Sequence, residues 1–367
     1  MDPLKPKKTC WAVIGGGNGG HATAGYLAIM GFPVRIYDIV PETIEAINKK
    51  GGIEVDGCVK GFGKLEFATL DIEKALDGAD IVMVVAPAIA HGAIAKKLAG
   101  NLSDGQIVFI HPGSTGGALE FKKVFDDEDC KADVVVCEAM SLIFAARLVE
   151  AGRVKILGIK GEMMVAAMPS RKTGYVLESI KEAFPMMYAG KNVLHTSLEN
   201  LNPVVHPGPS ILNTSMIESG MEWKYYWDGI TPTIGDFALQ IDTERREVGK
   251  AFGLELKSIM EWYILEYSAE GENLTEAVRN TKAYGEIYGP DRVDTRFLLE
   301  DIPMGLLPMV ELGRLGNVGT ERMDTVISMG GFLLGKNLRA GGRNLNRLGI
   351  DGMTVEEINR YLESGDK

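Results

Sequence analysis

The chain has 367 residues, of which 46% are hydrophobic and 24% are charged, and its formal net charge at pH 7 is −11. This composition is typical of a globular protein, and the length favours two domains over a single core. The acidic balance argues against nucleic acid as a partner, because binding to phosphates requires a basic surface.

The first apolar run, from Cys10 to Ile14, leads directly into a glycine-rich turn. Glycine in such a turn permits a tight bend, close approach of the backbone to a pyrophosphate and close packing of the next helix. A helix is expected over 22–30, beginning near Gly19, with its free N–H groups facing the phosphates. We expect a dinucleotide to contact Gly15, Gly17, Asn18, Gly19 and Gly20; a purely structural glycine turn is the alternative.

A second strand is predicted over 33–37, and Asp38 closes it. This acid lies 23 positions after Gly15, close to the interval at which a carboxylate reaches the adenosine ribose hydroxyls. Ile39 follows and supplies no cation for a 2′-phosphate, so the sequence favours NAD. NADP is not excluded, since a cation from another loop could reach the site.

Further apolar runs predict a parallel sheet that is buried on both faces. They lie at 12–14, 34–37, 81–85, 107–110 and 134–136. The glycine-rich stretch 51–63 is more like a hairpin, 153–159 predicts one more strand, and 171–184 predicts a helix. We therefore predict an α/β fold with a Rossmann-type doubly wound sheet, forming a dinucleotide-binding domain over 1–194.

After His195 the pattern becomes helical, with long candidates at 235–252, 256–267 and 321–334. We predict an all-helical C-terminal domain over 195–367 that binds the substrate and carries the catalytic groups. Its junction with the first domain is the expected substrate cleft.

Six residues at or near predicted helix and strand ends are candidate ligand contacts. Pro87 and Ala88 end the strand expected beneath the nicotinamide ribose, and His91 follows, either in contact with the cofactor or on a surface loop. His111 ends another strand, at the carboxyl edge where open sheets bind ligands, and precedes a glycine loop that contains Thr115. His21, at the first turn of the phosphate-binding helix, either assists anion binding or has only a packing role.

His206 is the candidate catalytic histidine, because the prolines of 202–209 hold its backbone and imidazole titrates near neutral pH. The alternative is a histidine that caps a helix from Ser210. A catalytic histidine needs a carboxylate partner, and candidates lie in 294–303. There, Arg296 and Asp301 either pair with each other or face separate targets, and arginine is suited to gripping a substrate carboxylate.

The four cysteines lack CxxC spacing and paired histidines, so we predict no metal site and reduced thiols in the cytoplasm. The N-terminus lacks the apolar region of a signal peptide. No apolar run approaches the ~18 residues of a membrane span, so no membrane association is expected.

Four motifs together resemble the octopine/nopaline dehydrogenases, and most of all their bacterial N-(1-D-carboxyethyl)-L-norvaline dehydrogenase type. They lie at 15–21, 112–117, 202–207 and 295–307, and the resemblance covers essentially the whole chain. It implies NAD(P)H-dependent reductive condensation of a 2-oxo acid with the amine of an amino acid, and a homodimer. It also implies that His206 is catalytic, that Asp301 is its partner and that Arg296 binds a substrate carboxylate. Thr115 and His111 are then expected at the substrate.

Two other classes stay open. A ketopantoate reductase or a glycerol-3-phosphate dehydrogenase would share the two-domain plan but would depend on lysine rather than on a histidine–aspartate pair. A catalytically silent NAD-binding sensor or scaffold is the other alternative. The stretches 138–147 and 223–228, expected at the amino acid side chain, match no single family member, so the identities of both substrates stay open.

Overall fold

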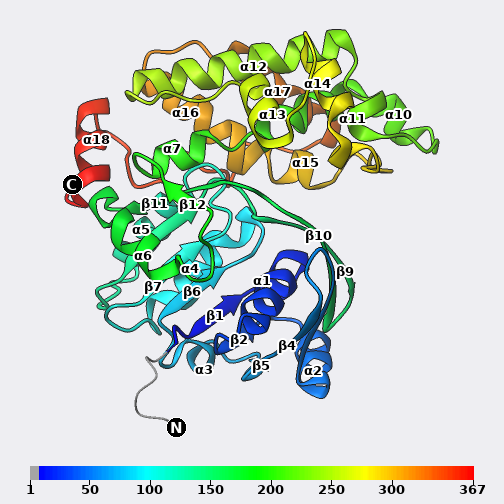
Figure 1. Cartoon of the computed structure of the whole chain (residues 1–367). Coiled ribbons are helices and arrows are strands. Elements are labelled where there is room, and N and C mark those ends of the chain that lie inside the picture. The colour runs from blue at the N-terminus through cyan, green and yellow to red at the C-terminus, as the bar shows by residue number, and fades with distance from the viewer. Residues whose placement is uncertain (1–7) are drawn as a thin grey trace. The chain divides into compact units, whose positions relative to one another are not determined.

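A computed structural model describes residues 8–367, which form two compact units (Figure 1). The sheet unit comprises the described residues up to Gly113 together with Gly117–Val193 and Glu363–Gly365. The helical unit comprises Ser114–Gly116, Leu194–Leu362 and Asp366–Lys367. No helix among the described residues is long and apolar enough to cross a membrane.

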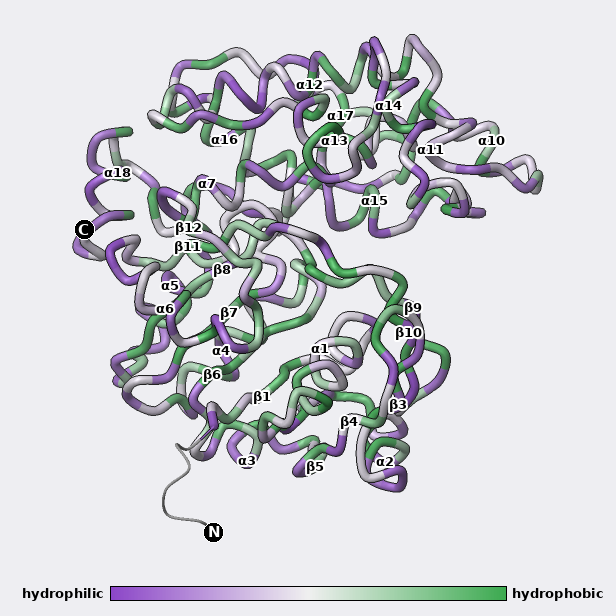
Figure 2. Tube along the Cα trace, in the orientation of Figure 1, coloured by the Kyte–Doolittle hydropathy of each residue, from purple (hydrophilic) through white to green (hydrophobic). Residues whose placement is uncertain are grey.

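An eight-stranded sheet organises the first unit, in the order β12-β11-β8-β7-β6-β1-β2-β5. Neighbouring strands run parallel, except that β11 is antiparallel to β8. β1, β6 and β7 are buried along their whole length, and apolar residues follow these strands in Figure 2. The strands are β1 (Trp11–Ile14), β2 (Val34–Tyr37), β5 (Phe67–Thr69), β6 (Ile81–Val84), β7 (Ile107–Ile110), β8 (Val135–Ala139), β11 (Met163–Met168) and β12 (Met187–Ala189).

The predicted α/β fold class is confirmed, and four strands differ from the expectation. β8 continues to Ala139, three residues beyond the expected run. β5, β11 and β12 were not expected, because β11 consists mainly of methionine and alanine and the other two span only three residues each. A fully buried strand needs apolar residues but no β-branched run, so composition alone misses it.

Helices connect the strands of the large sheet. α1 begins at Asn18, close to the expected start near Gly19, and Gly19 and Gly20 are helical and buried. The predicted helix 171–184 is shorter in the structure. A 3₁₀ turn replaces its first residues, and α6 ends at Ile180. The helices are α1 (Asn18–Ile29), α2 (Pro41–Lys50), α3 (Ile72–Leu76), η1 (Ala88–Ala90), α4 (His91–Ala99), α5 (Gly117–Asp127), η2 (Ser170–Lys172) and α6 (Thr173–Ile180).

A second, four-stranded sheet packs against α1. Its order is β4-β3-β10-β9, with β3 (Gly52–Gly57) and β4 (Gly61–Lys64) forming the predicted hairpin and with β9 (Phe144–Glu150) and β10 (Arg153–Ile159). A Cβ at Gly25 of α1 would lie 2.6 Å from the Val55 side chain. Glycine therefore allows this helix to approach the small sheet closely.

The helical unit contains no regular strand among its described residues; Lys224 and Tyr288 form an isolated bridge. The predicted helix 321–334 is observed, and 235–252 corresponds to Pro232–Ala251. The helix expected from Leu256 begins at Ile259, because Ser258 and Glu261 form a capping box. The helices are α7 (Val193–Leu198), α8 (Asn202–Val205), α9 (Pro207–Leu212), α10 (Thr214–Glu218), α11 (Tyr225–Asp228), α12 (Pro232–Ala251), α13 (Ile259–Tyr267), α14 (Leu274–Asn280), η3 (Lys282–Tyr284), α15 (Arg296–Leu299), η4 (Ile302–Leu306, a π-helical turn), α16 (Leu307–Leu315), α17 (Glu321–Leu334) and α18 (Val355–Ser364).

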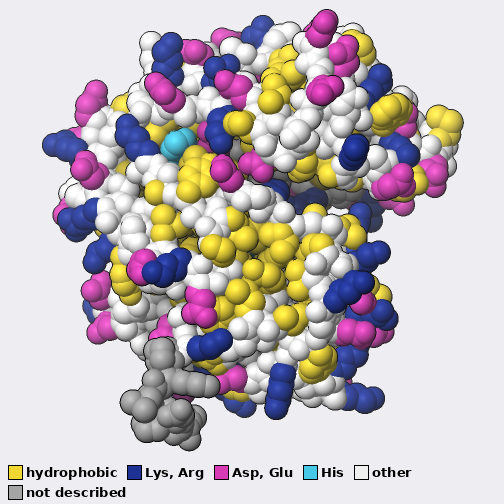
Figure 3. All heavy atoms as spheres, viewed as in Figure 1, with side chains coloured by type: hydrophobic (Ala, Val, Ile, Leu, Met, Phe, Trp, Pro, Cys, Tyr) yellow, Lys and Arg dark blue, Asp and Glu magenta, His cyan; other side chains and the backbone are white. Residues whose placement is uncertain are grey.

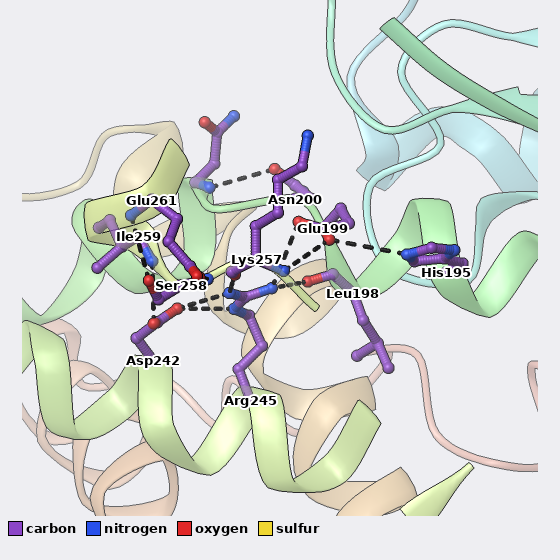
Figure 4. A network of polar contacts seen from close by, with 11 residues as sticks. His195, Leu198, Glu199, Asn200, Asp242, Arg245, Lys257, Ser258, Ile259 and Glu261 are labelled. Carbon is purple, nitrogen blue, oxygen red and sulfur yellow. Dashed lines mark hydrogen bonds and ion pairs between the residues drawn. The ribbon is translucent and has the colours of Figure 1, made fainter. Parts of the chain in front are cut away.

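A buried arginine ties three segments of the helical unit together (Figure 4). Asp242 Oδ1 accepts hydrogen bonds from Arg245 Nε at 2.9 Å and Nη2 at 2.7 Å, and Arg245 Nη1 donates to the Leu198 carbonyl at 2.6 Å. The second Asp242 oxygen accepts the Ile259 N–H at the start of α13. Because the arginine side chain is fully buried, these partners must replace its hydration.

Replacing Arg245 with Met is expected to destabilise the protein by about 3–5 kcal/mol, because Asp242 is left as a buried charge without its cation. Urea denaturation followed by circular dichroism measures the change. Lys181→Met is the control, because the Lys181–Glu178 pair is mostly exposed, and its free energy of unfolding should match that of wild type. Equal midpoints for Arg245→Met and wild type would contradict the structural role.

Candidate functional site

Two glycines of the first turn are required by the fold, and one leaves an open space. Gly15 has φ +116°, and a Cβ there would lie 2.3 Å from the Val85 carbonyl oxygen. A Cβ at Gly20 would lie 1.7 Å from the Gly15 carbonyl oxygen. Gly17 is exposed with nothing near its missing Cβ, and it precedes α1 without any side-chain cap. The turn therefore fits a phosphate held at a helix N-terminus.

Asp38 lies at the carboxyl end of β2, beside this turn. Its Oδ2 accepts the Gly16 N–H and its Oδ1 accepts the Val40 N–H at 2.8 Å. A carboxylate accepts about four hydrogen bonds, so capacity remains for a ribose diol. Ile39 is 75% exposed, and apolar side chains gather on the face of the sheet unit seen in Figure 3. The exposed Ile39 side chain next to Asp38 is suited to contact with a flat ring of a dinucleotide.

The other expected cofactor contacts differ in exposure. Asn18 is exposed, but its Oδ1 accepts the Leu148 N–H at 2.9 Å, which connects the start of α1 to β9. Gly19 is buried, and a Cβ there would lie 2.8 Å from the Val85 side chain. Pro87 precedes the short η1 turn after β6, and Ala88 is buried in it.

His21 and His91 are buried and hydrogen-bonded to the backbone. His21 Nδ1 lies 3.2 Å from the Gly17 carbonyl, and its Nε2 accepts the Gly152 N–H at 3.0 Å. Burial lowers the pKa of His21, so it packs as a neutral ring. His91 begins α4, with Nε2 3.3 Å from the Ala86 carbonyl. The surface-loop alternative for His91 is therefore wrong.

His111 is fully buried at the end of β7. The Ile143 N–H donates to its Nε2 at 3.0 Å, so the ring proton lies on Nδ1, for which the described residues provide no partner. Burial lowers the pKa of His111 to about 3, assisted by the positive charge of Lys160. The ring is therefore neutral, with one unused donor.

His206 stands between α8 and α9 and pairs with Asp301. The distance from His206 Nδ1 to Asp301 Oδ2 is 2.8 Å, and both side chains are nearly buried. The bond places the ring proton on Nδ1 of the neutral histidine and leaves Nε2 for chemistry. His206 occupies the N-cap position of α9, but its side chain makes no capping bond, so the capping alternative is wrong.

Local sequence brings these two groups together. Pro207 begins α9, where its missing N–H costs no helical hydrogen bond. Asp301 precedes η4, and a Cβ at Gly305 of that turn would lie 2.4 Å from the Pro203 side chain of α8. The absence of a side chain at Gly305 therefore lets the turn that carries Asp301 approach α8.

Two aromatic residues complete the surroundings of His206, and the sequence analysis did not single them out. The Phe297 ring of α15 stacks on the imidazole at a centroid distance of 4.1 Å. The Tyr226 hydroxyl of α11 lies 3.3 Å from His206 Nε2. Tyr226 falls inside the stretch 223–228 that was expected at the amino acid side chain, and its aromatic run was the available signal.

Arg296 and Thr115 both lie in the helical unit, but Arg296 is exposed and Thr115 is buried. Arg296 does not pair with the Asp301 side chain; its Nε lies 3.5 Å from Glu300 Oε2, and its side chain is 62% exposed. Thr115 is fully buried, and its carbonyl accepts a hydrogen bond from Arg343 at 3.1 Å. The Thr115 hydroxyl has no partner among the described residues.

Two family models match the chain. The alpha-helical domain of NAD/NADP octopine/nopaline dehydrogenases matches residues 189–334. The N-terminus of NAD-dependent glycerol-3-phosphate dehydrogenases matches residues 11–113.

Other relatives match this chain over nearly all of its length. An opine dehydrogenase from Arthrobacter sp. (strain 1C) is 41% identical over 96% of this chain and 98% of its own. The protein ocs of Agrobacterium tumefaciens is 26% identical over 96% of this chain and 98% of its own. A solved octopine dehydrogenase with NADH and L-arginine has a TM-score of 0.80 at 22% identity and covers 98% of this chain and 99% of that chain.

Because His111 is buried as a neutral ring, we predict that the folded protein loses stability on acidification. The pKa of His111 is about 3 in the folded protein, against an ordinary value of 6.5, so between these values the unfolded chain binds more protons. Stability from this group is therefore complete above about pH 6.5 and falls as the pH decreases. His111→Gln, which keeps an acceptor for the Ile143 N–H, should show a smaller decrease in Tm between about pH 6.5 and 4. Equal pH slopes would contradict the assignment.

Proposed function

The chain belongs to the opine dehydrogenase family, and on that premise we propose which of its residues carry out the family's reaction. The protein is an NAD(P)H-dependent oxidoreductase that condenses a 2-oxo acid reductively with the amine of an amino acid, and that performs the reverse oxidation. The observation that carries the assignment of roles is the 2.8 Å hydrogen bond between His206 and Asp301.

The cofactor is NAD(H), and the residues of the sheet unit fit it. We assign the phosphates to Gly15, Gly17, Gly19 and Gly20 at the start of α1, with Asn18 at the same turn, and the adenosine ribose to Asp38. Pro87 and Ala88 are assigned to the nicotinamide ribose. When bound, the reduced cofactor supplies the hydride that reduces the imine carbon. Asp38 followed by Ile39 favours NADH over NADPH, because neither residue attracts a 2′-phosphate.

His206 acts as the general acid through Nε2, since Nδ1 is held by Asp301. The amine adds to the 2-oxo carbon to form a carbinolamine, whose C–O bond then breaks. The leaving oxygen takes a proton from Nε2 of the protonated imidazole ring and departs as water, while the lone pair of the nitrogen forms the C=N bond. A protonated imine is left for reduction, and the ring becomes neutral. Asp301 supports the positive charge of the protonated ring and is a positioning residue.

We assign recognition of a substrate carboxylate to Arg296, whose exposed guanidinium has donors beyond those that face Glu300. The unpartnered donor of His111 and the unpartnered hydroxyl of Thr115 support a role for both at the substrate. The dinucleotide-binding role of residues 1–194 and the substrate role of 195–367 belong to the same proposal. The homodimer and the cytoplasmic location stay predictions.

Residues 11–113 match glycerol-3-phosphate dehydrogenases, which favours one alternative reaction: the reduction of a keto group without an amine. We expect oxidation of NADH by pyruvate to require an amino acid, because reductive condensation consumes an amine and the reduction of a lone keto group does not. A spectrophotometric screen of paired 2-oxo acids and amino acids measures this requirement, with each component omitted in turn as a control. NADH should outperform NADPH. Full activity without any amine would overturn the assignment.

His206→Ala is expected to lower kcat about 10²-fold or more, because a general acid is lost. NADH affinity, measured by fluorescence titration, should stay near that of wild type, since His206 lies in the helical unit and the glycine turn in the sheet unit. Asp301→Asn should also lower kcat, because an amide cannot support the charged ring. Wild-type turnover in His206→Ala would exclude its catalytic role.

A further inference from the structure

A tyrosine hydroxyl already lies at the atom that His206 uses for proton transfer. His206 Nδ1 is occupied by Asp301, and Nε2 lies 3.3 Å from the hydroxyl of Tyr226. Any substrate oxygen that takes a proton from Nε2 must come within about 3 Å of it. Such an oxygen therefore enters the immediate surroundings of the Tyr226 hydroxyl.

The ring of Tyr226 is held firmly in place. It stacks on Tyr284 at a centroid distance of 4.1 Å and meets Tyr225 edge-on at 5.1 Å. Only 7% of Tyr226 is exposed, and burial raises the pKa of its hydroxyl well above the ordinary value. Tyr226 therefore keeps its proton at neutral pH and offers a hydrogen-bond donor from a fixed position.

The hydroxyl of the neighbouring Tyr225 has different hydrogen-bond partners. The Tyr225 hydroxyl lies 2.8 Å from the His206 carbonyl and 3.0 Å from Ser210 Oγ, so it serves the fold. Within residues 8–367, the hydrogen-bond partner of the Tyr226 hydroxyl is His206 Nε2. A hydroxyl that bonds to the reacting nitrogen and not to the backbone is available to a ligand that displaces this contact.

We propose that Tyr226 is a catalytic residue, a second hydrogen-bond donor to the substrate oxygen that receives the proton of His206. The inference rests on the proposed function. In the free protein Tyr226 donates to Nε2 of the neutral imidazole. When substrate binds, its hydroxyl turns to the oxygen of the 2-oxo group, so that two donors converge on one oxygen.

The second donor acts while charge develops on that oxygen. As the amine nitrogen bonds to the 2-oxo carbon, the C=O π bond breaks and its electron pair moves to oxygen. The oxygen takes a proton from Nε2 of the protonated ring, while Tyr226 contributes a hydrogen bond and keeps its own proton. The neutral ring then takes a proton from the added nitrogen, so that Nε2 again carries the proton with which the hydroxyl leaves as water. Donors that are fixed before the reaction stabilise such charge without reorganisation.

The test is Tyr226→Phe, which keeps the ring that stacks on Tyr284 and removes only the hydroxyl. We expect kcat for reductive condensation to decrease on the order of 10²-fold, the effect of removing one donor to an oxyanion. The KM values for both substrates and the Tm should stay near those of wild type. Tyr267→Phe is the matched control. Tyr267 also packs on the Tyr284 ring, but its hydroxyl is not bonded to His206, so this variant should retain wild-type kcat.

Wild-type kcat in Tyr226→Phe would overturn the inference. A second measurement separates direct contact from an effect through the histidine. In a His206→Ala background, Tyr226→Phe should lower the residual rate further, because the donor acts on the substrate itself; an unchanged residual rate overturns direct donation. Failure of the proposed function has a different signature, since wild type and Tyr267→Phe would then also lack amine-dependent oxidation of NADH.

Discussion

The hydrogen bond between His206 Nδ1 and Asp301 is the interaction on which the proposed chemistry of this protein depends. It joins two segments that lie 95 residues apart in the chain. It fixes the tautomer of the neutral imidazole and so leaves Nε2 for the proposed proton transfer. Phe297 stacks on the same ring, so the imidazole has little freedom to turn. A general acid works best when its orientation is set before substrate binds.

The five histidines show how surroundings separate residues of one type. His21, His91 and His111 are fully buried in the sheet unit, and each bonds to the backbone. His195 lies 3.7 Å from Glu199, whose Oε1 accepts the Lys257 N–H and which therefore belongs to the network around Arg245. His206 combines a hydrogen-bonded carboxylate with an Nε2 whose hydrogen-bond partner among the described residues is a tyrosine hydroxyl. That combination is suited to reversible proton transfer.

Buried charge organises the helical unit away from the reacting atoms. Arg245 of α12 binds the end of α7 through the Leu198 carbonyl, and Asp242 caps the start of α13. Removal of one partner leaves the other charge without solvation, which makes such a network costly to break. The chain segment that leads from α7 to His206 is thereby held at one end.

The class of fold and the glycine turn of the candidate site could be predicted from the residues alone. A Rossmann-type turn needs glycine at positions such as 15 and 20 and a carboxylate such as that at 38. The continuous apolar runs correctly predicted the strands β1, β2, β6, β7 and β8 of the large sheet. The strand β11 was missed, because its methionines and alanines carry no strand signal and its burial comes from neighbours.

Only the tertiary structure decided how the charged and aromatic residues of the helical unit are paired. Spacing left Arg296 and Asp301 open to pairing with each other, whereas the fold pairs Arg296 with Glu300 and Asp301 with His206. Spacing also gave no sign that Tyr226 would lie at Nε2, since α11 is 20 residues from His206 in the chain. Local sequence sets dihedral angles and burial patterns. Contacts between distant segments depend on packing, such as that of Gly305 on Pro203, which no short motif encodes.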